Sequence, residues 1–297
     1  LICCPFLTSI KTPRLRFGIL AASLKNSELR MDTTLGTQVR WKAVALPPEH
    51  GGWGFLLEPI VLGMLVAPSW AGLFWGVAAL GAFLMQHPLK LAYTDRKRSR
   101  RYARTIAAER VLLIYAGVAL AGFLLAIALG GLTPLLPLAL VAPLGLVQVV
   151  DLLGNRGREL SRELAGSVAL AALVMAIVLA GGESVTLAFG LWAVQAARAV
   201  SSIIYVRERL HIEKGKPAAR GWVLASSGLA LAAIALLAWL DVVPVLAAVA
   251  IAILLARAAW GVSPWRRPAR AQKIGMLELG FGLLTVLLAA LGVAVGI

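Results

Sequence analysis

The sequence predicts an all-α, polytopic membrane helical bundle of about nine transmembrane helices, with the N-terminus in the cytoplasm and the C-terminus outside. Three observations support this fold class. The chain is 60% hydrophobic and only 14% charged, whereas a soluble domain averages about 25% charged residues. Apolar segments of spanning length recur along most of the chain. The basic residues between these segments all fall on one predicted side of the membrane.

Nine segments approach the length of about 20 mostly apolar residues that a spanning helix requires. They run over residues 49–67, 70–90, 106–129, 133–151, 163–181, 185–206, 219–239, 242–259 and 274–296. Four connections are short turns rich in Gly, Pro or polar residues, "APSW", "GGLTP", "GGES" and "DVVP". The other connections are longer and charged. The alternation predicts a series of helical hairpins.

The positions of the basic residues predict the orientation. Every Lys and Arg after Met31 precedes the first segment or lies in or beside the second, fourth, sixth or eighth connection. The alternate connections contain no Lys or Arg, and their charged residues are Glu183 and Asp241. Because Lys and Arg accumulate in cytoplasmic loops, these four connections are expected on the cytoplasmic side of the membrane. This bias also explains the net charge of +15 without a nucleic-acid partner.

The first part of the chain is expected to lie outside the membrane domain. Residues 1–30 show no sustained period, and we interpret residues 1–42 as an N-terminal extension, disordered or non-native, with Met31 as the expected start. Residues 43–297 are expected to form a single transmembrane helical domain.

Polar residues within the spans are the candidates for function, because ionisable groups in a bilayer are costly and usually face the bundle interior. They concentrate in the cytoplasmic halves, which predicts a polar cavity open to the cytoplasm. One stripe on residues 185–206 has the spacing i, i+3, i+7 and i+10 of a single helical face. The stretch "PPEHGGWGFLLEP" is expected to form the opposite wall. The candidate ligand-binding residues are His50, Glu58, His87, Lys90, Asp151, Asn155, Arg158, Gln195, Arg198, Ser202, Tyr205 and Glu278.

Some of these residues also have a structural interpretation. Lys90 and the run "DRKRSRR" fit side chains that extend their charge to the membrane surface. Ser202 fits the small polar residues that pack helices together. Arg198, about two turns inside the membrane end of its helix, favours a functional interpretation more strongly.

Three stretches, "EHGGWGFLLEPIVLGMLVAPS", "HPLKLAYTDRKRSRRYART" and "NRGRELSRELAGSVALAA", resemble the YwiC-like family of bacterial integral membrane proteins. The resemblance extends over about residues 43–296 and implies a multi-pass protein of a bacterial inner or plasma membrane, without specifying its chemistry. The layout is also similar, more distantly, to UbiA-type prenyltransferases, which bind a prenyl diphosphate through Mg²⁺ and two Asp-rich motifs. Here the second connection has only Asp95 and the sixth has no Asp, so the similarity implies the arrangement alone.

Three functions remain open from the sequence. The first is binding or transport of an anionic small molecule or a lipid head group in the expected cavity. The second is an intramembrane prenyl or lipid transferase with Asp-poor motifs, and the third is an accessory or assembly protein with a basic cytoplasmic face. The sequence predicts no metal site and identifies neither a cofactor nor a catalytic residue, and the choice between enzyme and non-enzyme stays open.

Overall fold

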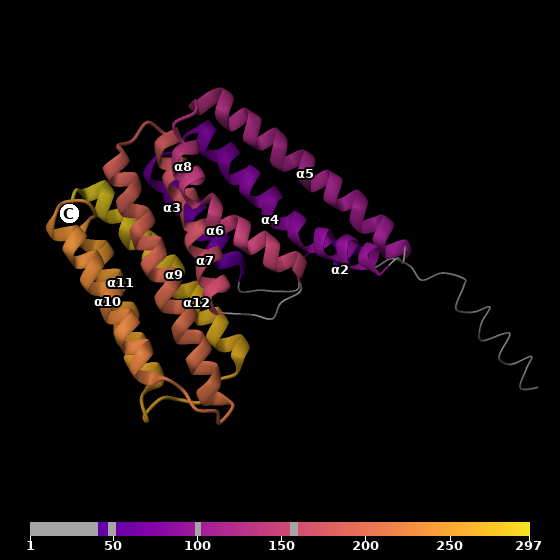
Figure 1. Ribbon diagram of the computed structural model, residues 1–297. Helices are drawn as coiled ribbons and strands as arrows, with labels where there is room; N and C mark the ends of the chain where they lie inside the picture. Colours follow the sequence, from indigo (N-terminus) through magenta and orange to yellow (C-terminus); the bar gives the residue numbers. More distant parts are fainter. Residues whose placement is uncertain (1–40, 47–51, 99–101, 155–159) are drawn as a thin grey trace, which may run out of the picture. The chain divides into compact units, whose positions relative to one another are not determined.

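The computed structural model describes residues 41–46, 52–98, 102–154 and 160–297 (Figure 1). All regular secondary structure within these ranges is helical. Residues Trp41–Ile297 form one compact unit. The helices are α2 (Trp41–Ala45), α3 (Gly52–Val66), α4 (Trp70–Lys97), α5 (Ala103–Gly130), α6 (Leu135–Gly154), α7 (Leu160–Ala171), α8 (Leu173–Ala180), α9 (Val185–Glu213), α10 (Arg220–Trp239), α11 (Val245–Val262) and α12 (Ala271–Val295).

The described helices confirm the predicted fold class. Each of the nine expected segments coincides with a helix, and the fifth coincides with the pair α7 and α8. Seven spans in the described residues are long and apolar enough to cross a membrane. Helix α3 and the apolar part of α6, Leu135–Val147, are shorter apolar helices. The chain is therefore a multi-pass membrane protein, and which side each end faces stays a prediction.

Two helices extend well beyond their predicted apolar segments at the ends expected in the cytoplasm. Helix α4 continues to Lys97, where the Asp95 carboxylate accepts hydrogen bonds from Arg104 and Thr105 of α5. Helix α9 continues to Glu213, whose carboxylate pairs with Arg209 one turn earlier at 2.8 Å. Side-chain partners therefore stabilise polar helical turns that hydropathy alone does not predict.

Helix α9 is the central element of the packing, since it contacts α7, α8, α10, α11 and α12. Figure 1 shows it alongside α10, α11 and α12. Helix α3 contacts α12, α8, α7, α4 and α9. Apolar residues of α3, α8, α9, α11 and α12 form a shared core that includes Leu62, Val178, Leu191, Leu254 and Val286. The polar faces of α3 and α9 are thereby enclosed inside the unit.

Small residues bring α4 and α5 into close contact. A Cβ atom added at Gly81 would lie 2.8 Å from the backbone nitrogen of Ala119, and one at Gly122 would lie 2.9 Å from that of Ala78. The two glycines therefore let the two backbones approach each other, as small residues do in membrane helix pairs. Gly117, also on α5, has nothing within 4 Å of an added Cβ.

We predict that Gly122→Ala destabilises the protein and that Gly117→Ala does not. The added methyl group at residue 122 meets backbone atoms, so the helices must separate at an expected cost of about 1–3 kcal/mol. At residue 117 the same change meets open space and should be neutral or stabilising by up to about 1 kcal/mol. Thermal unfolding of both variants in detergent micelles measures the difference, and equal melting temperatures would contradict this packing.

Candidate functional site

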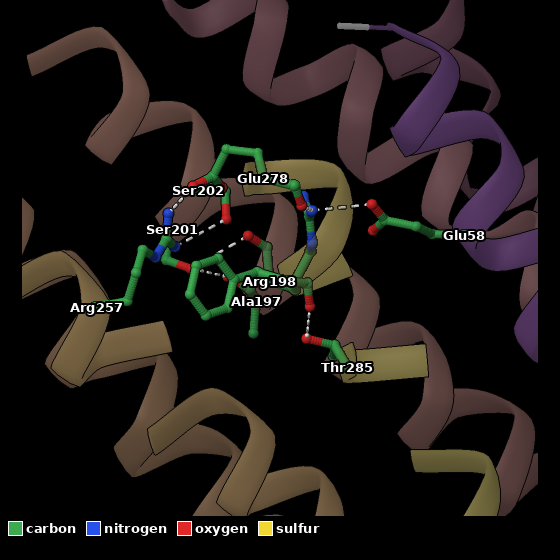
Figure 2. A network of polar contacts seen from close by, with 9 residues as sticks. Glu58, Ala197, Arg198, Ser201, Ser202, Arg257, Glu278 and Thr285 are labelled. Atoms are coloured by element: carbon green, nitrogen blue, oxygen red, sulfur yellow. Dashed lines mark hydrogen bonds and ion pairs between the residues drawn. The ribbon is translucent and has the colours of Figure 1, made fainter. Parts of the chain in front are cut away.

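Four ionisable side chains from four helices meet inside the unit and form the site that we call the four-charge cluster. They are Glu58 of α3, Arg198 of α9, Arg257 of α11 and Glu278 of α12 (Figure 2). Glu58 and Arg198 have relative side-chain accessibilities of 8% and 2%. The sequence segments that supply these residues are far apart, so the site exists only in the folded bundle.

Arg198 is held by contacts on three sides. Its Nη2 atom lies 2.9 Å from Oε1 of Glu58. The same nitrogen donates a hydrogen bond of 2.7 Å to the main-chain carbonyl of Glu278. The guanidinium group lies over the ring of Phe55, 5.3 Å from its centroid, at a distance suited to a cation–π contact. Arg198 therefore links α9 to both α3 and α12.

Arg257 makes the second ion pair of the cluster, with Oε1 of Glu278. Its Nη2 atom donates a hydrogen bond of 3.3 Å to the hydroxyl oxygen of Ser202. Its guanidinium lies 4.1 Å from the ring centroid of Tyr205 and 5.2 Å from that of Phe281. These two rings lie on α9 and α12, and each is close enough to the guanidinium for a cation–π contact.

The cluster is balanced in charge but incomplete in hydrogen bonding. It contains two carboxylates and two guanidinium groups. Among the described residues, the Nε atoms of Arg198 and Arg257, Oε2 of Glu278 and Nε2 of Gln195 are buried without a hydrogen-bond partner. Buried polar atoms usually have hydrogen-bond partners, so these four atoms have the capacity for a further hydrogen bond.

Glycine makes room for the first ion pair. A Cβ atom added at Gly282 of α12 would overlap Oε1 of Glu58 and Nη2 of Arg198. One added at Gly54 would lie 3.3 Å from Oε1 of Glu58. A larger residue at 282 would therefore occupy the space in which the carboxylate and the guanidinium meet.

The structure brings together part of the residue set that the sequence predicted. Glu58, Arg198 and Glu278 belong to the four-charge cluster, Ser202 and Tyr205 contact Arg257, and Gln195 is buried on the same face of α9. The shared face of the α9 stripe is thus as expected from the helical period, and Glu58 lies opposite Arg198 as expected for the two walls. The role of these residues in binding a ligand stays a prediction.

Other candidates lie elsewhere or outside the description. Lys90 is exposed and His87 half-buried on α4, which supplies no residue to the four-charge cluster. Asp151 lies in α6, but its side chain is outside the described part of the structure. His50, Asn155 and Arg158 also lie outside the described residues.

The sequence interpretation missed Arg257, which the positive-inside count assigned to a cytoplasmic connection. It lies instead within α11, five residues before the helix ends at Val262. Its position inside the apolar run "AILLARAAW" was the available signal. The aromatic partners Phe55 and Phe281 were missed because an isolated Phe in an apolar helix carries no distinctive pattern.

A separate pocket of about 510 Å³ lies where α4 meets α5, lined by Asp95, Arg98, Tyr102 and Arg104. Asp95 and Arg104 form an ion pair at 2.8 Å there. Within the described ranges, no group of three His, Cys, Asp or Glu side chains is placed to hold a metal ion.

Residues 46–178 match the family model of YwiC-like proteins. Over these residues the chain is YwiC-like. This confirms the resemblance for helices α3 to α7 and most of α8, and the expected extension to residue 296 stays a prediction. The YwiC-like part supplies Glu58, whereas the other three members of the four-charge cluster lie beyond it. No match was found among curated proteins or among solved structures.

We predict that Gly282→Ala weakens the fold by forcing Glu58 away from Arg198. The free energy of unfolding should fall by about 1–3 kcal/mol, the usual cost of overpacking. Gly280→Ala is the matched control on the same helix, because nothing lies within 4 Å of a Cβ atom added there. Melting temperatures of the two variants in detergent test this prediction. A Gly282→Ala variant with the same melting temperature as the wild type would contradict it.

Proposed function

We propose that this protein binds an anionic small molecule or lipid head group at the four-charge cluster, with Arg198 and Arg257 as the residues that hold the anion. The observation that supports this most directly is the pair of buried guanidinium groups whose Nε–H donors have no partner among the described residues. A phosphate-type oxyanion is the ligand class that fits these donors, since guanidinium presents a planar fork that matches its oxygens.

The location of the cluster supports access from one side of the membrane. Glu58 and Glu278 lie within about two turns of the N-terminal ends of α3 and α12, and Arg257 lies within about two turns of the C-terminal end of α11. The positive-inside pattern assigns all three ends to the cytoplasm. The basic residues at those ends would also attract anions by long-range electrostatics.

The competing explanation is that the four charges only hold the helices together. Ion pairs of this kind lose much of their attraction to the cost of removing both charges from water, so replacing a pair by neutral groups is often tolerated. A purely structural cluster therefore predicts no anion affinity in the wild type and no specific effect of an arginine substitution on binding.

We predict that Arg198 is required for anion binding even when the fold is preserved. Removing Arg198 alone leaves Glu58 without its counter-charge, so the informative comparison is Glu58→Gln, which keeps Arg198, against the neutral double variant Glu58→Gln/Arg198→Gln. Loss of a charge-assisted hydrogen bond, about 1.5–3 kcal/mol, should weaken binding roughly 10- to 100-fold in the double variant.

Isothermal titration of detergent-purified protein with dimethyl phosphate and with dihexanoylphosphatidylglycerol measures these affinities. The first probe represents a soluble phosphodiester and the second a lipid head group. The ratio of the two affinities therefore identifies the source of the ligand. Arg220→Gln is the control, since Arg220 is exposed at the start of α10. Equal affinities of the single and double variants would refute the proposal.

A further inference from the structure

The charge balance of the four-charge cluster sets a condition on any anion that enters it. With both carboxylates ionised, the two guanidinium groups are already neutralised by Glu58 and Glu278. A bound monovalent oxyanion would leave one net negative charge inside apolar helices. Buried charges without a counter-charge are strongly disfavoured, so anion entry requires a compensating positive charge.

The Glu58–Arg198 pair is the one that an anion can open more readily. Among the described residues, Arg198 is the only cation within ion-pair distance of Glu58. The Arg257–Glu278 pair has more support, because Arg257 also contacts Ser202, Tyr205 and Phe281. An oxyanion that takes the Arg198 guanidinium therefore releases the Glu58 carboxylate.

Among the described residues, no second cation lies within ion-pair distance of Glu58 to pair with the released carboxylate. Of the helices packed against α3, α9 brings Arg198 to the cluster and α12 brings Glu278, a second carboxylate. Helix α8 carries no titratable residue in "LVMAIVLA". Charged or titratable residues on α4 and α7, the other two neighbours of α3, include His87, Lys90, Arg162 and Glu163. None of these four belongs to the four-charge cluster.

We propose that anion binding at this site is coupled to the uptake of one proton, which Glu58 takes from the aqueous phase as the anion replaces its carboxylate on Arg198. The inference rests on the proposed function and specifies its regulation. No bond in the ligand breaks: one oxyanion and one proton enter together, and the cluster stays neutral. Such coupling makes the site sensitive to pH and would allow a proton gradient to drive anion accumulation.

Titration calorimetry of the full chain in detergent tests this, with dimethyl phosphate and dihexanoylphosphatidylglycerol as probes. Neither phosphodiester changes protonation near neutral pH, so a difference in binding heat between buffers of unequal ionisation enthalpy reports protons taken up by the protein. The expected uptake is about one proton per anion, and the affinity should fall roughly tenfold per pH unit while Glu58 is ionised in the free protein.

Glu58→Gln mimics the protonated side chain, so it should bind the probe with no proton uptake and no pH dependence. The exposed control Glu183→Gln should keep the uptake of one proton. A wild type that binds neither probe overturns both the proposed function and the coupling. A wild type that binds without proton uptake, or a Glu58→Gln variant that retains it, overturns the coupling alone.

Discussion

The burial of Arg198 inside the helical unit is the constraint on which the rest of the site depends. An arginine keeps its charge under all ordinary conditions, so a guanidinium with a relative side-chain accessibility of 2% must find counter-charge and acceptors in the protein. Glu58 supplies the charge and the main chain of Glu278 supplies an acceptor. These contacts tie α3, α9 and α12 together, and they specify which faces of the three helices meet.

The residues around the ion pairs are explained by the same requirement. Gly282 leaves space for the carboxylate and guanidinium, and a Cβ atom there would overlap both. Phe55 covers one guanidinium, while Tyr205 and Phe281 cover the other. The four-charge cluster is therefore a neutral polar group inside an apolar bundle. The proposed function would exchange one carboxylate of this cluster for an external anion, so the charge balance of the cluster and the proposed function are linked.

Much of the fold followed from the sequence because hydropathy and turn residues act locally. The nine apolar segments coincide with helices, and the helical period correctly placed Arg198, Ser202 and Tyr205 on one face. Local patterns do not specify which helices are neighbours. The sequence therefore predicted that the Glu58 segment and the Arg198 helix form opposite walls, but not that the two side chains form an ion pair. Arg257 was misassigned because the positive-inside rule does not distinguish a loop arginine from one in the last turns of a helix.

A double-mutant cycle on Glu58 and Arg198 tests the central claim most directly. The unfolding free energies of Glu58→Gln, Arg198→Gln and the double variant, measured in detergent, give the coupling between the two side chains. The account predicts that each single variant is destabilised, because it leaves one buried charge uncompensated, and that the double variant recovers much of the loss, with a coupling on the order of 1–3 kcal/mol. Strictly additive effects would show that the two side chains do not form the buried ion pair, and would contradict the account.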